Sequence, residues 1–192
     1  MGWKICCFNT RGKNFKLIFE ELKLKGIFKI QLEKIEDERG FFSRCWDKNE
    51  FEKRGLNTKI IQCNISFNKN KGTLRGLHYQ SKPYEEAKLI HCTRGKIYEV
   101  ILDLRKESKT YKQWESMELS QSDYNLLYVP EGFALGFQTL EDNTELLYQM
   151  SEKYVPESAR GINYKDPKFD IKWPLEVQTI SQRDSSFEFF KE

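Results

Sequence analysis

Short runs of alternating apolar and polar residues fill most of the chain between residues 59 and 150. Most of the gaps between these runs contain Gly, Asn, Asp or Pro. Many short strands at regular spacing are typical of an antiparallel sandwich or barrel. We expect strands at 59–67, 73–80, 87–93, 96–105, 114–119, 125–129, 133–140 and 144–150. No helix-length pattern alternates with them, so a parallel α/β sheet is disfavoured.

The regions outside this block predict few further elements. Residues 26–35 alternate like a strand and are followed by a turn at 37–40. A short helix is expected from Asp47 to Gly55, because Asp47 and Glu50 have capping-box spacing and Gly55 can end the helix. From Val155 the tail carries three prolines and is interpreted as an ordered segment of loop and helix wrapped on the barrel. Residues 1–14 are expected to form an extension or a disordered arm, and 15–192 a single domain.

One predicted strand has an ambiguous face. Between residues 97 and 104 the even positions are all apolar, whereas the odd positions alternate isoleucine with Glu99 and Asp103. Acids in such an alternation usually indicate a solvated face, and we favour that interpretation. In a small barrel the same residues could instead face a lumen that holds a ligand.

Composition narrows the function classes. The 192-residue chain has 32 basic and 29 acidic residues with no basic block, so nucleic acid is not an expected partner. No apolar run approaches the length of a membrane span, so we expect no membrane association. Five cysteines without a CxxC pair indicate a reduced, cytoplasmic protein. Two histidines cannot build a metal site of clustered histidines, so no metal is expected.

The segment 72–80 carries the first candidate for chemistry. His78 lies there with Arg75, and Gly72 and Gly76 flank the arginine. Arg75 and His78 would point to opposite faces of a regular strand, so a bulge at Gly76 would be needed to turn both inward. Glycine inside a strand is typical of a bulge or of close approach by a ligand or backbone. Taken alone, a histidine in a strand is more often structural than catalytic, and we interpret His91 as structural.

Several short motifs together give a resemblance. They are 37–42, 62–66, 72–80, 87–88, 99–105, 129–133, 140–143, Tyr148 and 181–184. In this order and spacing the chain resembles the dTDP-4-dehydrorhamnose 3,5-epimerases of the cupin superfamily over about residues 15–187. The resemblance implies a cupin-type jelly-roll barrel, usually a homodimer that exchanges N-terminal strands. It also implies a nucleotide-diphosphate sugar as substrate and no cofactor.

The resemblance further implies roles for individual residues. His78 matches the base, Asp184 the carboxylate that orients it, Tyr148 the acid on the opposite face of the sugar, and Lys88 the residue beside the enolate oxygen. The matches to substrate-binding positions are Arg39, Phe42, Arg44, Gln62, Asn64, Arg75, Glu99, Leu135, Tyr154 and Arg183. Arg39 and Phe42 are expected to reach the nucleotide across from the partner subunit. The implied reaction is epimerisation at C3, C5 or both of a nucleotide-linked 4-keto-6-deoxy sugar.

Three positions depart from the family pattern. Leu135 stands where a second histidine is usual, Arg44 where glutamate is usual, and Glu99 where aspartate is commoner. Leu135 cannot hydrogen-bond to the sugar, and Arg44 reverses the charge beside the nucleotide base. A single-centre epimerase or a 3,4-ketoisomerase acting on a CDP- or GDP-linked sugar therefore stays open. So does a non-catalytic barrel that binds a sugar nucleotide.

Overall fold

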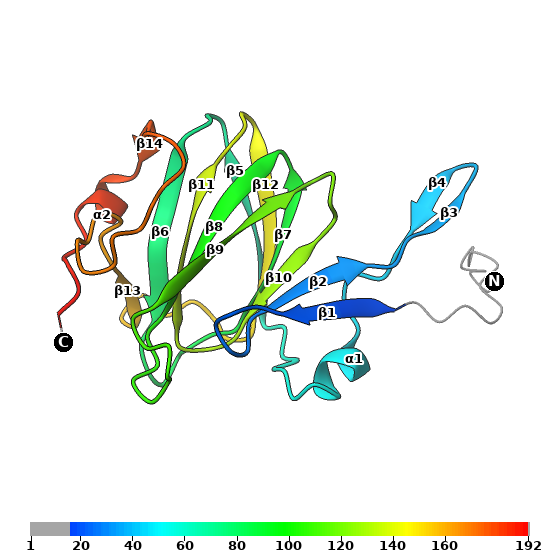
Figure 1. Cartoon of the computed structure of the whole chain (residues 1–192), viewed down its shortest axis with the longest axis horizontal. Coiled ribbons are helices and arrows are strands. Elements are labelled where there is room, and N and C mark those ends of the chain that lie inside the picture. The colour runs from blue at the N-terminus through cyan, green and yellow to red at the C-terminus, as the bar shows by residue number, and fades with distance from the viewer. Residues whose placement is uncertain (1–15, 192) are drawn as a thin grey trace.

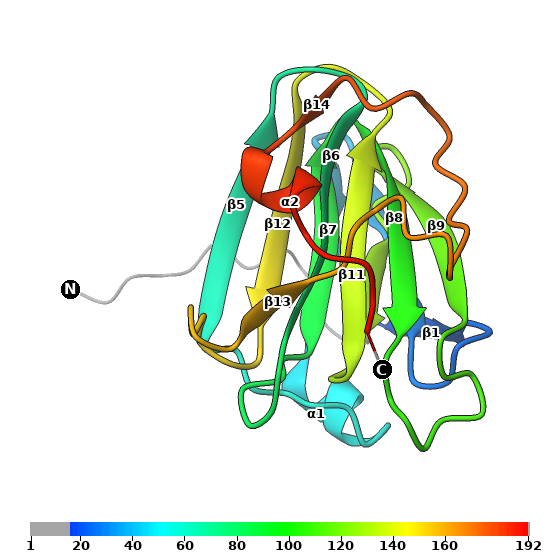
Figure 2. The same ribbon diagram turned by 90° about the vertical axis from the view of Figure 1, so that its left-hand side faces the viewer.

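The computed structural model describes residues 16–191, and the predicted extension at residues 1–14 lies outside that range. Two six-stranded sheets face each other, which confirms the predicted all-β jelly roll (Figures 1 and 2). One sheet has the order β1-β2-β10-β7-β12-β5. The other has the order β13-β6-β11-β8-β9, with β14 also pairing with β6.

The two sheets are built from strands whose bounds lie close to those expected. β6 and β12 match their predicted ranges at both ends. The strands of the first sheet are β1 (Leu17–Glu21), β2 (Phe28–Leu32), β10 (Leu126–Val129), β7 (Lys88–Arg94), β12 (Thr144–Met150) and β5 (Gln62–Asn68). Those of the second are β13 (Ala159–Gly161), β6 (Thr73–Gln80), β11 (Phe133–Thr139), β8 (Lys96–Asp103), β9 (Trp114–Ser120) and β14 (Thr179–Ile180).

The main core lies between the two sheets. Ile90 and Leu127 from the first sheet pack there with Ile97 and Ile101 from the second. The interpretation of the odd face of β8 as solvated is therefore wrong, because these side chains point into the barrel. The even face of β8 is also buried, since Val100 and Leu102 pack beneath the C-terminal segment.

The helix α1 (Lys48–Glu52) precedes the main block of strands. The Asp47 side chain caps it by accepting a hydrogen bond from the Glu50 backbone N–H at 3.2 Å. The helix is shorter than expected and stops before Gly55. Phe51 anchors it to the first sheet, with its ring 5.7 Å from that of Tyr128.

The C-terminal segment wraps on the barrel with loop and helix as predicted, and it also holds two short strands that were not expected. It forms β13, β14 and the one-turn helix α2 (Gln182–Ser185) along β6 (Figure 2). β13 and β14 are only three and two residues long, too short to show an alternating pattern. The segment also covers the outside of the second sheet, where Trp114 Nε1 donates to the Phe169 carbonyl at 2.8 Å.

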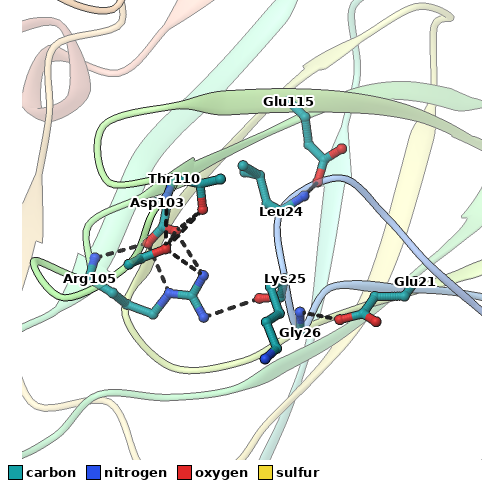
Figure 3. A network of polar contacts seen from close by, with 9 residues as sticks. Glu21, Leu24, Lys25, Gly26, Asp103, Arg105, Thr110 and Glu115 are labelled. Atoms are coloured by element: carbon teal, nitrogen blue, oxygen red, sulfur yellow. Dashed lines mark hydrogen bonds and ion pairs between the residues drawn. The ribbon is translucent and has the colours of Figure 1, made fainter.

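The N-terminal elements are tied to one end of the barrel. At the end of β8, Arg105 donates to both carboxylate oxygens of Asp103, at 2.9 and 2.8 Å, and also to the Lys25 carbonyl at 3.1 Å (Figure 3). Beyond β2, the hairpin of β3 (Ile35–Asp37) and β4 (Gly40–Phe42) projects away from the barrel (Figure 1). The hairpin is thus the part of the described chain that extends furthest from its own sheets.

Candidate functional site

The expected bulge in β6 is present. Along the β6–β11 pair, Leu135 lies opposite His78 and Phe137 lies opposite Arg75. The chain therefore advances by two residues on β11 but by three on β6, which places one extra residue in β6. The extra residue turns Arg75 and His78 to the same side, where both line one cavity. Gly76 has φ +120, and a Cβ there would lie only 2.5 Å from the Gly136 Cα. Glycine is required at this position for both reasons.

His78 is held by Asp184, which is 106 residues later in the chain. The His78 Nε2 lies 2.8 Å from Asp184 Oδ1, and the Gly76 backbone N–H donates to Oδ2 at 3.1 Å. Burial raises the pKa of Asp184, but the hydrogen bonds from His78 and Gly76 outweigh it and leave the pKa lowered. The ionised carboxylate fixes Nε2 as the protonated ring nitrogen, so Nδ1 can accept a proton.

A pocket opens in front of His78. Its inner part is a cavity of about 170 Å³ and its outer part a cavity of about 320 Å³. His78, Lys88 and Tyr148 line both parts, so the two form one continuous pocket. The structure therefore brings the four predicted catalytic residues together, three on the pocket wall and Asp184 directly behind His78.

Lys88 and Tyr148 come from the first sheet, across the barrel from His78. Lys88 Nζ pairs with Glu86 Oε1 at 2.9 Å, and both side chains are largely buried. Burial raises the pKa of Tyr148, and the positive charge of Arg75 only partly offsets the effect. Tyr148 is accordingly a neutral phenol that can donate a proton at neutral pH.

The outer part of the pocket is polar. Gln62 donates to Asn64 Oδ1 at 3.0 Å and accepts from the Tyr154 backbone N–H at 3.1 Å. Arg183 reaches the Tyr154 hydroxyl at 3.4 Å. Arg160, which was not predicted, also lines this part. Guanidinium and amide groups of this kind suit a diphosphate and a nucleotide base.

The inner part is mostly apolar. Leu135 is 7% exposed and Glu99 only 2% exposed, and both line it as expected for substrate-binding positions. Burial raises the pKa of Glu99 to about 8, and the neighbouring charge of Lys88 partly opposes the shift.

Three predicted residues are not on the pocket wall of this chain. Arg39 and Phe42 lie on the projecting β3–β4 hairpin, where Arg39 bonds to the Asp37 carboxylate. Arg44 pairs with Asp47, the capping residue of α1, at 2.7 Å. None of the three lines either part of the pocket.

Sequence reasoning missed some residues around His78. Ser66, Ile90 and Leu146 line the inner cavity, and period-two spacing from Asn64, Lys88 and Tyr148 could have found them. Phe187 packs edge-on against the His78 ring at 5.8 Å, and no pattern in the sequence signals that contact.

Within residues 16–191 we find neither a cluster of metal-ligating side chains nor a membrane-spanning helix. Among residues 16–191, no three His, Cys, Asp or Glu side chains are grouped so that they could hold a metal ion. No helix in that part of the chain is long and apolar enough to cross a membrane.

Comparison with known proteins gives a consistent match. Residues 21–192 match the family described as dTDP-4-dehydrorhamnose 3,5-epimerase. The enzyme of that name from Sinorhizobium fredii is 38% identical over 172 residues, which is 89% of this chain and 88% of the relative.

Solved structures agree with the sequence match. The Bacillus anthracis dTDP-4-dehydrorhamnose 3,5-epimerase with TDP and pyrophosphate bound is 34% identical, with a TM-score of 0.88 over 91% of this chain and 100% of that one. The Legionella pneumophila enzyme RmlC in complex with dTDP-4-keto-L-rhamnose is 33% identical, with a TM-score of 0.85 over 91% of this chain and 93% of that one. With its fold, pocket and sequence all in agreement, this chain belongs to the dTDP-4-dehydrorhamnose 3,5-epimerase family.

Proposed function

We propose that this protein inverts C3 and C5 of a dTDP-linked 4-keto-6-deoxy sugar. The observation that carries the proposal is the His78–Asp184 pair facing Tyr148 across a pocket, in a chain of this family. The relative from Legionella pneumophila, whose structure holds dTDP-4-keto-L-rhamnose, supports the same class of substrate.

The proposed chemistry begins with removal of a proton. A C–H beside a ketone becomes acidic only when the resulting enolate is stabilised. His78 takes the proton, and Asp184 stabilises the imidazolium that forms. The Lys88 ammonium stabilises the negative charge that develops on O4.

The second step returns a proton to the other face of the sugar. Tyr148 lies on β12 and His78 on β6, which belong to opposite sheets. A sugar between them therefore loses its proton to one side and regains one from the other, which inverts the carbon. These side chains supply each proton transfer, so the scheme uses no cofactor.

The nucleotide end of the substrate is assigned to the outer part of the pocket. Arg160 and Arg183 provide positive charge for the diphosphate there, and Gln62 and Asn64 provide amide groups for the nucleotide. Arg75, which the resemblance matches to the same role, lines the inner part and would reach the diphosphate from that side. Tyr154 is half exposed beside them and offers a ring for packing. This assignment leaves the apolar inner part for the sugar.

We infer a homodimer whose hairpins complete each other's sites. The outer face of β5 exposes Ile65 to 69% and Phe67 to 44%, an apolar surface that a second copy would cover. Because β1 and β2 pair within their own sheet, the projecting β3–β4 hairpin is the segment that we assign to the partner's pocket. It would carry Arg39 and Phe42 to the nucleotide.

We also propose a reducing, cytoplasmic location. Cys45, Cys63 and Cys92 are free thiols, and two of the three are exposed to solvent. Exposed free thiols suit a reducing compartment.

Hydrogen exchange tests the proposed reaction directly. The protein is incubated in deuterated water with the dTDP-linked 4-keto-6-deoxy sugar, and NMR follows C3 and C5. We expect deuterium at both carbons, a product with both centres inverted, and loss of both signals with His78→Ala. A wild-type protein that leaves both carbons unlabelled would refute the proposal.

A second candidate is inversion at one carbon, or action on another nucleotide. It rests on Leu135, which removes hydrogen-bonding capacity from the inner pocket, and on Arg44. Parallel incubations with CDP- and GDP-linked sugars separate these cases. The second candidate would be excluded if the dTDP-linked sugar is labelled at both C3 and C5 at full rate and the CDP- and GDP-linked sugars are not labelled.

A further inference from the structure

The inner end of the pocket contains a buried carboxyl group without a hydrogen-bond partner. Glu99 Oε2 is fully enclosed, yet it bonds to no atom of the described residues 16–191. The Ser66 hydroxyl, which lines the same cavity, is buried in the same state. A buried polar atom left unpaired costs about 1–3 kcal/mol, so two of them around one cavity point to a ligand.

Three basic groups that face this cavity already have partners. Lys88 pairs with Glu86 at 2.9 Å, and Arg75 donates to Asn68 Oδ1 at 2.7 Å. His78 is held by Asp184. Among the acidic and basic residues on the inner wall, Glu99 is therefore the one whose side chain is free to hydrogen-bond to a bound molecule.

The two residues paired with Glu99 on the adjacent strands are apolar. On β8 it lies opposite Phe137 of β11 on one side and Met117 of β9 on the other. Leu135 closes the same part of the cavity and offers no polar atom. A histidine at position 135 would add a hydrogen-bonding group here. With leucine in its place, Glu99 is the polar side chain that β8 and β11 contribute to the cavity.

Burial also sets the form of the acid. Because the pKa of Glu99 is raised to about 8 by burial, with Lys88 partly opposing the shift, the side chain is a neutral carboxylic acid at neutral pH. In that form it offers both an O–H donor and a carbonyl acceptor. A sugar hydroxyl has the matching acceptor and donor.

We propose that Glu99 and Ser66 are the polar groups of a sugar subsite, and that Glu99 binds one hydroxyl of the sugar ring and determines specificity for it. Leu135, Ile90 and Leu146 give the subsite its apolar wall, which suits the methyl group of a 6-deoxy sugar. The inference rests on the proposed function, because it takes the sugar to occupy the inner cavity.

Binding measurements test the subsite without requiring turnover. Calorimetry compares dTDP with a dTDP-linked 6-deoxy sugar that lacks the ketone and cannot react. We expect Glu99→Leu to weaken binding of the sugar nucleotide by about 10- to 100-fold and to leave dTDP within about 3-fold. Glu99→Gln keeps a donor and an acceptor in the same shape, so it should stay close to wild type.

Sugar analogues identify the hydroxyl. With 2-deoxy and 3-deoxy forms of the ligand, the loss caused by Glu99→Leu should vanish for one form and persist for the other. Glu118→Leu makes the same change on the neighbouring strand β9 outside the pocket, and it should alter neither affinity. Equal weakening of dTDP and sugar nucleotide, or no weakening at all, would overturn the subsite.

The two proposals fail in different ways. If wild-type protein binds the sugar nucleotide but exchanges no proton, the proposed reaction is wrong, and the Glu99→Leu comparison still decides the subsite. If exchange proceeds normally and Glu99→Leu binds every ligand like wild type, the reaction stands and the subsite is wrong.

Discussion

His78 and Tyr148 divide the proposed proton transfers because they belong to opposite walls of the barrel. His78 comes from the sheet that the C-terminal segment covers, and that segment supplies Asp184. Tyr148 comes from the other sheet and has a pKa raised by burial. One residue is therefore prepared to accept a proton and the other to donate one.

Tyr148→Phe should separate proton removal from inversion. The variant keeps the ring but lacks the hydroxyl, so His78 can still remove a proton and return it to the same face. We expect deuterium to enter the substrate while formation of the inverted product falls by about 10²–10⁴-fold. NMR of the recovered substrate and product measures both rates. Equal loss of labelling and inversion would contradict this division.

Single residues differ in how far the sequence predicts them. His78 and Asp184 were predicted because the motifs around them resemble those of a known family, and their contact spans 106 residues. The face of Glu99 was misjudged because β8 is buried on both sides. A period-two pattern with acids on one face looks the same whether that face is solvated or lines a cavity. Phe187 was missed because its contact depends on the path of a segment without periodicity.

At the scale of elements, the bulge in β6 creates the site. Without the extra residue at Gly76, Arg75 and His78 would face opposite sides of the sheet. The space for the bulge comes from Gly136 on β11, whose Cα lies where a Cβ of residue 76 would have to fit. Two glycines on adjacent strands thus allow one base to face the pocket.

Gly76→Ala should be costly for this reason. The substitution adds a clash to an unfavourable backbone conformation, so we expect a loss of roughly 3–5 kcal/mol in the free energy of unfolding. Gly40→Ala is the matched control, because Gly40 has φ +122 but no atom within 4 Å of its Cβ position. It should lose only about 1–2 kcal/mol. Urea unfolding measures both, and equal losses would mean that packing against Gly136 is unimportant.

The C-terminal segment orders the base through a second contact. Gly161 of β13 lies opposite His78, and a Cβ on it would fall 2.1 Å from the Phe187 ring. The ring of Phe187 thus fills the space above Gly161 and packs against His78. Asp184 and Phe187 restrict the imidazole from two directions.

Phe187→Ala should therefore lower kcat more than it raises KM. We expect a fall of about 10-fold in kcat, since a loosened base spends less time in the reactive geometry. Phe187→Leu should restore part of the rate. Phe190→Ala removes a neighbouring ring that packs on Phe169 instead, and it tests docking of the segment alone. Similar kinetic losses in both alanine variants would argue against a specific effect on His78.

Elements were predictable where their pattern is long. β6 and β12, with eight and seven residues, were predicted at both ends. β13 and β14 were not, because each exists only through pairing with β6. The helix α1 was predicted from its capping residue, but its end depends on packing of Phe51 against the sheet.

For the whole molecule, the inferred dimer makes a prediction about mixtures of variants. If the β3–β4 hairpin serves the partner's pocket, an Arg39→Ala chain and a His78→Ala chain together form one intact site per mixed dimer. Unfolding and refolding the two inactive variants together should restore about a quarter of wild-type activity. The control pair, His78→Ala with Asp184→Asn, changes one and the same site and should restore nothing. Failure of the first pair would place the hairpin in its own chain's site.

The pairing of His78 with Asp184 also has a consequence for how the protein matures. Asp184 follows all the barrel strands in the chain, so the residue that orients the base reaches its place only when the C-terminal segment docks on the barrel. In a refolding experiment, β-sheet circular dichroism should recover before enzymatic activity does. The delay would measure how long the C-terminal segment takes to dock on a finished barrel, and until then the newly made protein is folded but inactive.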